Sequence, residues 1–271
     1  MVKKDINHLK NLTSLINIMK TLRDPENGCP WDIAQDFNSI APHTIEEAYE
    51  VFDAIQSRNW ENLKEELGDL LLQAVYHSQM AEELGLFNFE DVIRKICNKM
   101  VLRHPHIFSD NKYKTSINEQ TKFWETIKEK ERKKTSQGTT FSGIALSLPA
   151  LLRSLKIQKR VSRTGFDWAT IEPVFVKLDE EINELKLAQE LNDKVQIKEE
   201  IGDILFSIVN LARHLETDPE DALRSANIKF IKRFEKMEDF ALRGGVDFDK
   251  LDQDQMNELW EKIKKEPDNN T

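Results

Sequence analysis

Apolar residues recur along this chain three or four positions apart, with polar residues between them, which is the spacing of one helix face. In the first half this pattern covers residues 44–55, 63–76 and 91–100. In the second half it resumes just after Pro173, a residue type that suits the first turn of a helix. No segment alternates apolar and polar residues with the period of two that is typical of a half-buried strand. The pattern therefore predicts an all-α protein.

The same residues also occur twice, in the same order. E-E-A-Y-E at 46–50 matches E-E-I-N-E at 180–184, an offset of 134, and K-E-E-L-G-D-L-L at 64–71 matches K-E-E-I-G-D-I-L at 198–205 with no change of offset. Ordered internal similarity on this scale indicates a repeated structural unit. Three shorter pairs continue the series: G-C-P-W (28–31) with G-F-D-W (165–168), K-M-V-L-R (99–103) with K-F-I-K-R (229–233), and F-W-E-T-I-K (123–128) with L-W-E-K-I-K (259–264).

The repeat predicts two helical-bundle modules in tandem. The most polar interior stretch, rich in small residues, is 131–143, so we expect a first module over 1–134, a linker over 135–147 and a second module over 148–271. A helical module of this size leaves much apolar surface exposed. We therefore expect the modules to pair, with each other or with a second chain in a homodimer.

Carboxylates crowd the first of these helices. Glu46 and Glu50 share one stripe of a helix with Glu47 beside them, and Glu66 and Asp69 share a stripe of the next helix. One interpretation is local: Thr44 would be the N-cap, Thr44-x-x-Glu47 a capping box, and the other charges a solvated face. The other interpretation is a metal site, formed where two antiparallel helices bring the carboxylates together.

The second copy favours the metal site. Glu180 and Glu181 lie about two turns into the helix that Pro173 begins, where a capping role is not available, yet the same E-E-x-x-E and E-x-x-D recur. Clustered carboxylates repel one another unless a cation lies among them, and Mg²⁺ prefers oxygen ligands. The chain has no His or Cys at zinc-ligand spacing nearby and no Glu-x-x-His pair of the di-iron type. A magnesium site beside cations would suit a phosphate substrate.

Basic and aromatic residues recur in both copies as candidates for that substrate. Lys229 and Arg233 are four residues apart on one helix face and could bind phosphate oxygens together, or form an ordinary surface pair. Lys99 and Arg103 repeat them in the first copy. Lys177 lies three residues before Glu180 and could join the carboxylate patch, but its counterpart is His43. Two tryptophans, Trp260 and Trp124, could stack on a base or belong to the core.

Composition narrows the class of protein further. The net charge of −9 comes without a clustered basic stripe, which argues against nucleic acid as a partner. The 9 Gly and 8 Pro are few for a strand-rich fold. No apolar run approaches the roughly 18 residues that a membrane-spanning helix needs. Cys29 and Cys97 lack metal-type or redox-type spacing, so we expect reduced thiols in a cytoplasmic protein.

With these motifs the chain resembles the MazG-type nucleoside triphosphate pyrophosphohydrolases of the all-α NTP pyrophosphatase superfamily, and the resemblance covers nearly the whole chain. Some relatives carry an additional amino-terminal methyltransferase-like domain, whereas the resemblance here begins directly at the first module. The motifs are R-D-P-E-N-G-C-P-W-D, T-I-E-E-A-Y-E, E-E-L-G-D-L-L, R-H-P-H-I-F, K-I-Q-K-R, V-S-R-T-G-F-D-W, E-E-I-G-D-I-L-F, V-N-L-A-R-H-L and A-N-I-K-F-I-K-R-F.

The resemblance implies an enzyme that hydrolyses nucleoside triphosphates to monophosphate and diphosphate as a homodimer, with Mg²⁺ or alternatively Mn²⁺. It implies water attack on the α-phosphorus, with Glu180 or Glu181 acting on the water. It credits hydrolysis to the second module, although the first keeps the same residue types. The implied metal ligands are Glu181, Glu184, Glu200 and Asp203, the implied substrate contacts are Lys177, Lys229, Arg233 and Trp260, and the first-module counterparts are Glu47, Glu50, Glu66, Asp69, Lys99 and Arg103.

Two alternatives remain for the function. Within the same superfamily, the chain could be a narrower enzyme for dUTP or phosphoribosyl-ATP. Outside enzymes, it could be a helical module that binds nucleotide or a partner protein without turnover. The sequence leaves base preference and physiological substrate open.

Overall fold

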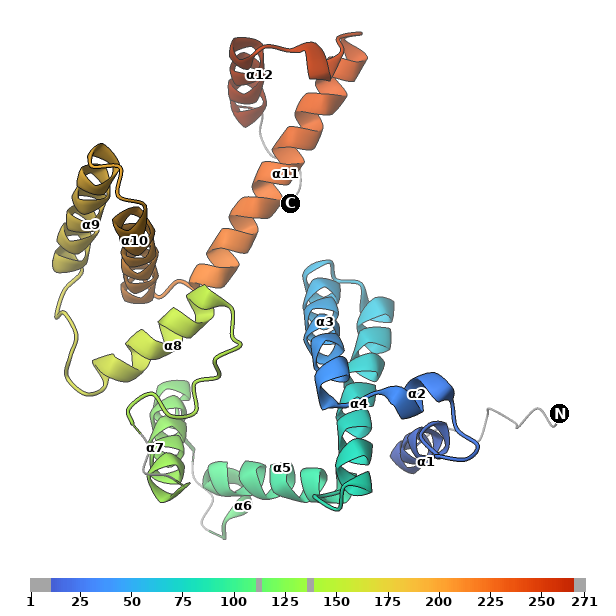
Figure 1. Cartoon of the computed structure of the whole chain (residues 1–271). Coiled ribbons are helices and arrows are strands. Elements are labelled where there is room, and N and C mark those ends of the chain that lie inside the picture. Colours follow the sequence, from blue (N-terminus) through green and yellow to red (C-terminus); the bar gives the residue numbers. More distant parts are fainter. Residues whose placement is uncertain (1–10, 111–113, 136–138, 266–271) are drawn as a thin grey trace. The chain divides into compact units, whose positions relative to one another are not determined.

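The structure is a computed structural model that describes residues 11–110, 114–135 and 139–265 (Figure 1). Within these ranges the regular elements are all helices, as the apolar periodicity predicts. The chain divides into two compact units, Met1–Ile127 and Lys128–Thr271. The division falls inside helix α7 (Ile117–Thr135), eight residues before the start of the linker expected over 135–147. Residues 136–138 of that linker lie outside the described ranges, and the linker remains a prediction.

The first unit is built on a hairpin of two long helices, α3 (Phe37–Gln56) and α4 (Trp60–Glu83), which pack along each other. Helix α1 (Leu12–Leu22) packs against α4 and closes the core on one side. The core residues share near-complete burial: Met19, Ile40, Val75, Tyr76, Met80 and Phe89. The remaining helices of this unit are α2 (Pro30–Ala34), α5 (Phe89–Arg103), α6 (Pro105–Phe108) and the part of α7 before the division.

Helix α3 begins earlier than its sequence predicts. Asp36 is the N-cap: its carboxylate accepts from the backbone N–H of Ser39 at 2.8 Å, and the Ser39 hydroxyl accepts from the backbone N–H of Asp36 at 2.9 Å. Pro42 therefore lies inside the helix, where it removes one backbone hydrogen bond. The expected N-cap at Thr44, and with it the Thr44–Glu47 capping box, is wrong. The Thr44 hydroxyl instead contacts Nε2 of His77 on α4 at 2.9 Å, which links the two helices.

The second unit repeats this plan. Its hairpin consists of α9 (Glu172–Glu190) and α10 (Lys194–His214), and α8 (Ala150–Ser162) packs against α10 as α1 packs against α4. Pro173 is the second residue of α9, in agreement with its predicted place in the first turn. The repeat extends to the hairpin turns, where Arg58 and Asn192, 134 positions apart, have positive φ values of 53° and 54°. Asn59 and Asp193 follow them as side-chain N-caps of α4 and α10.

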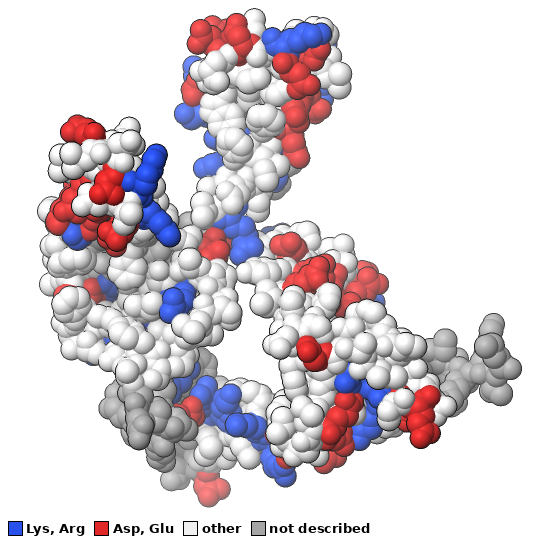
Figure 2. Space-filling model, in the orientation of Figure 1, with Lys and Arg blue, Asp and Glu red and all other residues white. Residues whose placement is uncertain are grey.

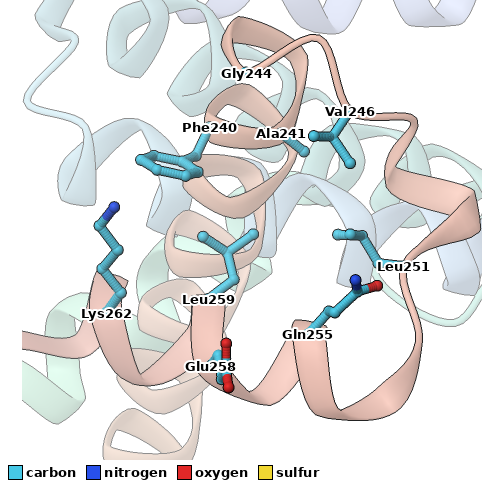
Figure 3. A pocket seen from close by; sticks show the side chains of 9 residues that line it. All are labelled: Phe240, Ala241, Gly244, Val246, Leu251, Gln255, Glu258, Leu259 and Lys262. Carbon is cyan, nitrogen blue, oxygen red and sulfur yellow. The ribbon is translucent and has the colours of Figure 1, made fainter.

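The second unit also contains another pair of packed helices. The long helix α11 (Pro219–Arg243) is followed by the short helix η2 (Phe248–Lys250) and by α12 (Gln253–Lys265), which packs back against α11. Figure 3 shows the apolar hollow between the end of α11 and α12, with Phe240 and Leu259 on its walls. Lys262 of α12 covers the Phe240 ring, with its Nζ 4.0 Å from the ring centroid.

Both units leave large apolar side chains exposed, as modules of this size are expected to do. On α10, Ile201, Leu205 and Ile208 recur along one face and are each more than 40% exposed, at 46%, 48% and 42%. Helix α5 shows a similar row at Val92, Ile93 and Ile96. Among the described residues, no helix is both long and apolar enough to cross a membrane.

Candidate metal centres

The hairpin of the second unit brings three carboxylates together. Glu181 and Glu184 lie on one face of α9, and Glu200 lies in the second turn of α10, which runs back beside it. One carboxylate oxygen from each residue lies within 4.8 Å of the other two. Glu181 is buried, with a side chain only 6% exposed. Figure 2 shows acidic side chains gathered on the surface that α9 and α10 form.

Asp203, the fourth predicted ligand, lies one turn after Glu200 on α10. It stands outside the closest group of three but interacts with it. The pKa of Glu200 is raised, first by partial desolvation and then by the negative charges of Glu184, Glu181 and Asp203. Glu200 therefore lies within the electrostatic influence of the other three predicted ligands.

The first unit forms an equivalent cluster. Glu47 of α3 joins Glu66 and Asp69 of α4, again with one oxygen of each within 4.8 Å of the others. Burial, then the charge of Asp69 and then Glu50, raise the pKa of Glu47. Partial desolvation, then Glu50, then Asp69, raise the pKa of Glu66. In the first unit, Glu50 is thus the fourth carboxylate, which lies outside the closest group of three but acts on it electrostatically. Asp203 is the fourth carboxylate of the second unit.

The donor set fits a hard divalent cation. Both clusters offer only carboxylate oxygens, which suits Mg²⁺ or Mn²⁺ and not zinc. Ligands about 2.1 Å from an octahedral Mg²⁺ lie at most roughly 4.2 Å from one another. A spread of up to 4.8 Å is only slightly wider, so small side-chain rotations would bring the oxygens to that separation. Desolvation is the first cause of the raised pKa values of Glu47, Glu66 and Glu200, and such a cation would offset the second cause, the repulsion between carboxylates.

Glu181 and its counterpart in the first cluster, Glu47, have different partners. In the second unit, the ammonium of Lys177 lies 2.7 Å from Glu180 and 2.8 Å from Glu181. Hydrogen bonds to Glu180 and then Glu181 raise the pKa of Lys177, so it stays charged. In the first unit, His43 at the corresponding position contacts Glu46, 3.3 Å away, and not Glu47.

Glu47 has a neutral partner instead, which the sequence did not reveal. The side-chain amide of Gln73, a buried residue of α4, donates to Glu47 at 3.4 Å. The position that corresponds to Gln73 in the second unit is Ser207. The repeat therefore could not identify Gln73 as a site residue, because the second copy has a different residue type at this position.

The predicted phosphate-binding cations lie on other helices. Lys229 and Arg233 are on α11, which packs against α8, α10, η2 and α12. Lys99 and Arg103 are on α5, which packs against α4 and α6. Figure 1 shows α5 leaving the end of α4 that lies away from the turn with α3. The cluster carboxylates of α4, Glu66 and Asp69, lie in its first half, so the structure does not bring Lys99 and Arg103 to them within one unit.

The two tryptophans differ in their surroundings. Trp124 donates from its indole nitrogen to the carbonyl of Arg103 at 2.9 Å and packs edge-on to His104, which is a structural role. Trp260 is half-buried on α12, with its ring 5.2 Å from that of Phe230 on α11. Base stacking by Trp260 remains a prediction.

In each unit an arginine–carboxylate ion pair lies at the end of the hairpin opposite its turn. In the second unit the guanidinium of Arg213, near the end of α10, donates to both carboxylate oxygens of Asp167, at 2.8 and 2.5 Å. In the first unit Arg23 bonds in the same way to Glu83, near the end of α4, at 2.7 Å. These pairs join the loop or helix before the hairpin to its second helix. The sequence comparison did not identify them, because the paired residues do not align between the repeats.

The fold and the two clusters together define a class: an all-α protein of tandem helical hairpins, each with carboxylates placed for a hard divalent cation. Comparison with known families identifies which one. The MazG nucleotide pyrophosphohydrolase domain matches residues 35–108 and residues 170–237, and each matched segment contains one of the clusters. The chain belongs to the MazG family.

Individual relatives resemble the chain over most of its length. It is 45% identical over 260 residues to the nucleoside triphosphate pyrophosphohydrolase of Escherichia coli, covering 95% of this chain and 98% of that protein. It is 46% identical over 250 residues to the nucleoside triphosphate pyrophosphohydrolase/pyrophosphatase MazG of Thermotoga maritima, covering 92% and 94%. It is also 40% identical over 249 residues to the uncharacterized protein YabN of Bacillus subtilis, covering 92% of this chain and 50% of that protein.

Proposed function

We propose that this protein is a nucleoside triphosphate pyrophosphohydrolase that converts NTP and water to NMP and diphosphate. The observation that carries the proposal is the cluster of Glu181, Glu184 and Glu200, whose oxygens converge within 4.8 Å inside a segment that matches the family domain. The names of the relatives from Escherichia coli and Thermotoga maritima support the same reaction. The proposed setting is the cytoplasmic nucleotide pool, with broad use of NTPs and dNTPs.

In the proposed site, Glu181, Glu184, Glu200 and Asp203 would hold Mg²⁺, or Mn²⁺ in its place. When bound, the cation supplies charge neutralisation of the triphosphate. Glu181 is the most buried of these ligands, with a side chain 6% exposed. Glu66, Asp69, Glu47 and Glu50 would be the corresponding ligands in the first module.

The reaction needs water to attack the α-phosphorus while the bond from that phosphorus to the α–β bridging oxygen breaks, so that diphosphate leaves. Glu180 is half exposed beside the cluster, and in the proposed reaction Glu180 or Glu181 would orient the water or accept its proton. Lys177, already beside both residues, would bind the triphosphate. Lys229 and Arg233 would offset the negative charge on the leaving diphosphate, and Trp260 would contact the base.

We propose a homodimer as the working form. The apolar rows on α10 and α5 are typical of surfaces that a partner covers. Lys229 and Arg233 lie on α11, a different element from the one that carries Glu181 and Glu184. A second chain is a source of the additional cations and of the apolar cover that one module lacks.

The test is diphosphate release by the purified protein across the common NTPs and dNTPs, dUTP and phosphoribosyl-ATP, with Mg²⁺ present. We expect release from several triphosphates, and a loss of at least about 100-fold in Glu200→Ala and Asp203→Ala, since each removes a proposed ligand. The matched variants Glu66→Ala and Asp69→Ala report on the first module separately. Unchanged release in Glu200→Ala and Asp203→Ala would reject the site; no release from any triphosphate would favour a binding module without turnover. Release from dUTP or phosphoribosyl-ATP alone would identify the narrower enzyme.

A further inference from the structure

The two clusters offer nearly the same carboxylates but not the same net charge. In the second unit, a lysine lies within the cluster: the ammonium of Lys177 is 2.8 Å from Glu181, the buried carboxylate of the cluster. In the first unit, the corresponding residue is His43, which contacts only the exposed Glu46, 3.3 Å away. The second cluster is thus one unit less negative than the first whenever Lys177 remains in place.

The first cluster has a different neighbour at the same carboxylate. Gln73 is buried, and its amide nitrogen contacts Glu47 at 3.4 Å. Its amide oxygen is also buried and has no hydrogen-bond partner. Buried acceptors are normally satisfied, and one beside a carboxylate cluster is placed to accept from a water molecule on a bound cation. A neutral amide also leaves the negative charge of the cluster intact.

We infer that Lys177 is an internal counter-cation, and that it makes the second module bind a divalent metal ion more weakly than the first module in the absence of nucleotide. An ammonium beside Glu181 opposes a second cation electrostatically and competes with it for the same oxygen. The first module lacks this competitor. Its cluster is therefore the tighter divalent-cation site of the nucleotide-free protein.

During the proposed reaction Lys177 would have two alternative sets of partners, the carboxylates of the cluster and the phosphates of the substrate. Without substrate it pairs with Glu180 and Glu181. A triphosphate that arrives next to the cluster offers it stronger anionic partners and would draw it from Glu181. Metal binding at the second module is then favoured when substrate is present, because the competitor has moved. This part rests on the proposed function; the difference between the nucleotide-free clusters requires only that they bind metal.

The test measures binding of Mn²⁺ alone to the full chain, with free Mn²⁺ followed by electron paramagnetic resonance. Glu200→Ala with Asp203→Ala leaves only the first cluster intact, and Glu66→Ala with Asp69→Ala leaves only the second. We expect the first of these proteins to bind Mn²⁺ on the order of tenfold more tightly than the second. Adding Lys177→Met to the second protein should recover about that factor, and His43→Lys in the first should lose it, because a lysine there has the same spacing to Glu46 and Glu47.

The matched control is Lys186→Met, which removes the same charge from an exposed position of α9 outside the cluster and should leave Mn²⁺ affinity within about twofold. Circular dichroism establishes that each variant is folded, and Lys177→Gln replaces Lys177→Met if the latter is not. Equal affinities of the two clusters, no effect of Lys177→Met beyond that of Lys186→Met, or no Mn²⁺ binding at millimolar concentration would each overturn the inference. Diphosphate release is measured on the same wild-type protein, so its absence would reject the proposed function while the Mn²⁺ result still decides the role of Lys177.

Discussion

At the scale of single residues, Glu200 shows most directly how clustered carboxylates lower the stability of the folded protein. Partial desolvation and the charges of Glu184, Glu181 and Asp203 raise its pKa. A carboxyl group with a raised pKa in the folded state binds protons more readily there than in the unfolded chain. The repulsion therefore lowers stability at neutral pH and is relieved as the pH falls through the raised pKa.

We expect Glu200→Gln to raise the melting temperature of the protein in EDTA at pH 7, because it removes one charge from the cluster. The advantage over wild type should shrink as the pH falls toward the raised pKa of Glu200, because wild-type Glu200 then begins to protonate. Adding Mg²⁺ should stabilise wild type more than Glu200→Gln, since the variant has lost a ligand.

Thermal unfolding at several pH values, with and without Mg²⁺, provides the measurement. The control is Glu190→Gln, a carboxylate of α9 away from the cluster, which should change neither quantity. If Glu200→Gln proved less stable than wild type in EDTA, the repulsion described for this cluster would not be significant.

At the scale of the elements, the α9–α10 hairpin is held to the preceding loop by Arg213 and Asp167. The Arg213 hydrogen bonds are the main cause that holds the pKa of Asp167 below its usual range, aided by the charges of Arg213 and His214 against partial burial. Both side chains are mostly shielded from water, at 12% and 27% exposure. A lowered folded-state pKa means that the pair stabilises the protein above the ordinary pKa of an aspartate and loses this contribution as the pH falls through the lowered value.

Asp167→Asn should therefore cost about 2 kcal/mol of unfolding free energy at pH 7, the usual size for a hydrogen bond to a charged partner. The cost should diminish as the pH falls from the ordinary pKa of an aspartate, about 4, toward the lowered folded-state pKa of Asp167, because protonation removes the charge that the pair needs. Urea unfolding between pH 3 and pH 7 gives the comparison. Asp179→Asn, on the exposed face of α9, is the control and should show no such dependence. A cost that stayed constant over this range would contradict the ion pair as its source.

At the scale of the whole molecule, the exposed apolar rows are the surfaces that the proposed homodimer would cover. Ile201, Leu205 and Ile208 form a continuous face on α10, and burying such a face is favourable by about 25 cal/mol per Å². Homo-oligomers commonly pair identical patches about a two-fold axis. The proposed dimer follows from that surface, whichever triphosphate is the substrate.

Leu205→Asp should weaken the proposed dimer by at least about tenfold in dissociation constant, because it would bury an unpaired charge in the interface. Sedimentation velocity at several protein concentrations measures the change. Leu191→Asp is the matched control, since Leu191 is 75% exposed at the end of α9, away from this row. A wild-type protein that sediments as a monomer at micromolar concentration would reject the proposal.

Features carried by neighbouring residues were predictable from sequence. The helices, the repeat offset of 134 and the carboxylate motifs that both copies share all follow from spacing within one or two elements. They depend on the periodicity of a helix and on the antiparallel return of a short hairpin, both of which are local properties. The start of α3 was mispredicted, because Pro42 and Thr44 were taken to mark it. In the structure the side chains of Asp36 and Ser39 instead cap the backbone N–H groups earlier in the chain, so the helix begins at Phe37.

By itself, the sequence determined that this protein is all-α, that it consists of two related modules, and which carboxylates both modules repeat. Only the tertiary structure decided which three carboxylates converge in each module, that Glu181 faces Lys177 whereas Glu47 faces Gln73, and that the predicted phosphate-binding cations lie on other helices. The physical reason is the distance along the sequence between the residues that interact. A helix is specified by residues a few positions apart, but the charge balance of a site depends on which side chains the packing of separate helices brings within about 3 Å of one another.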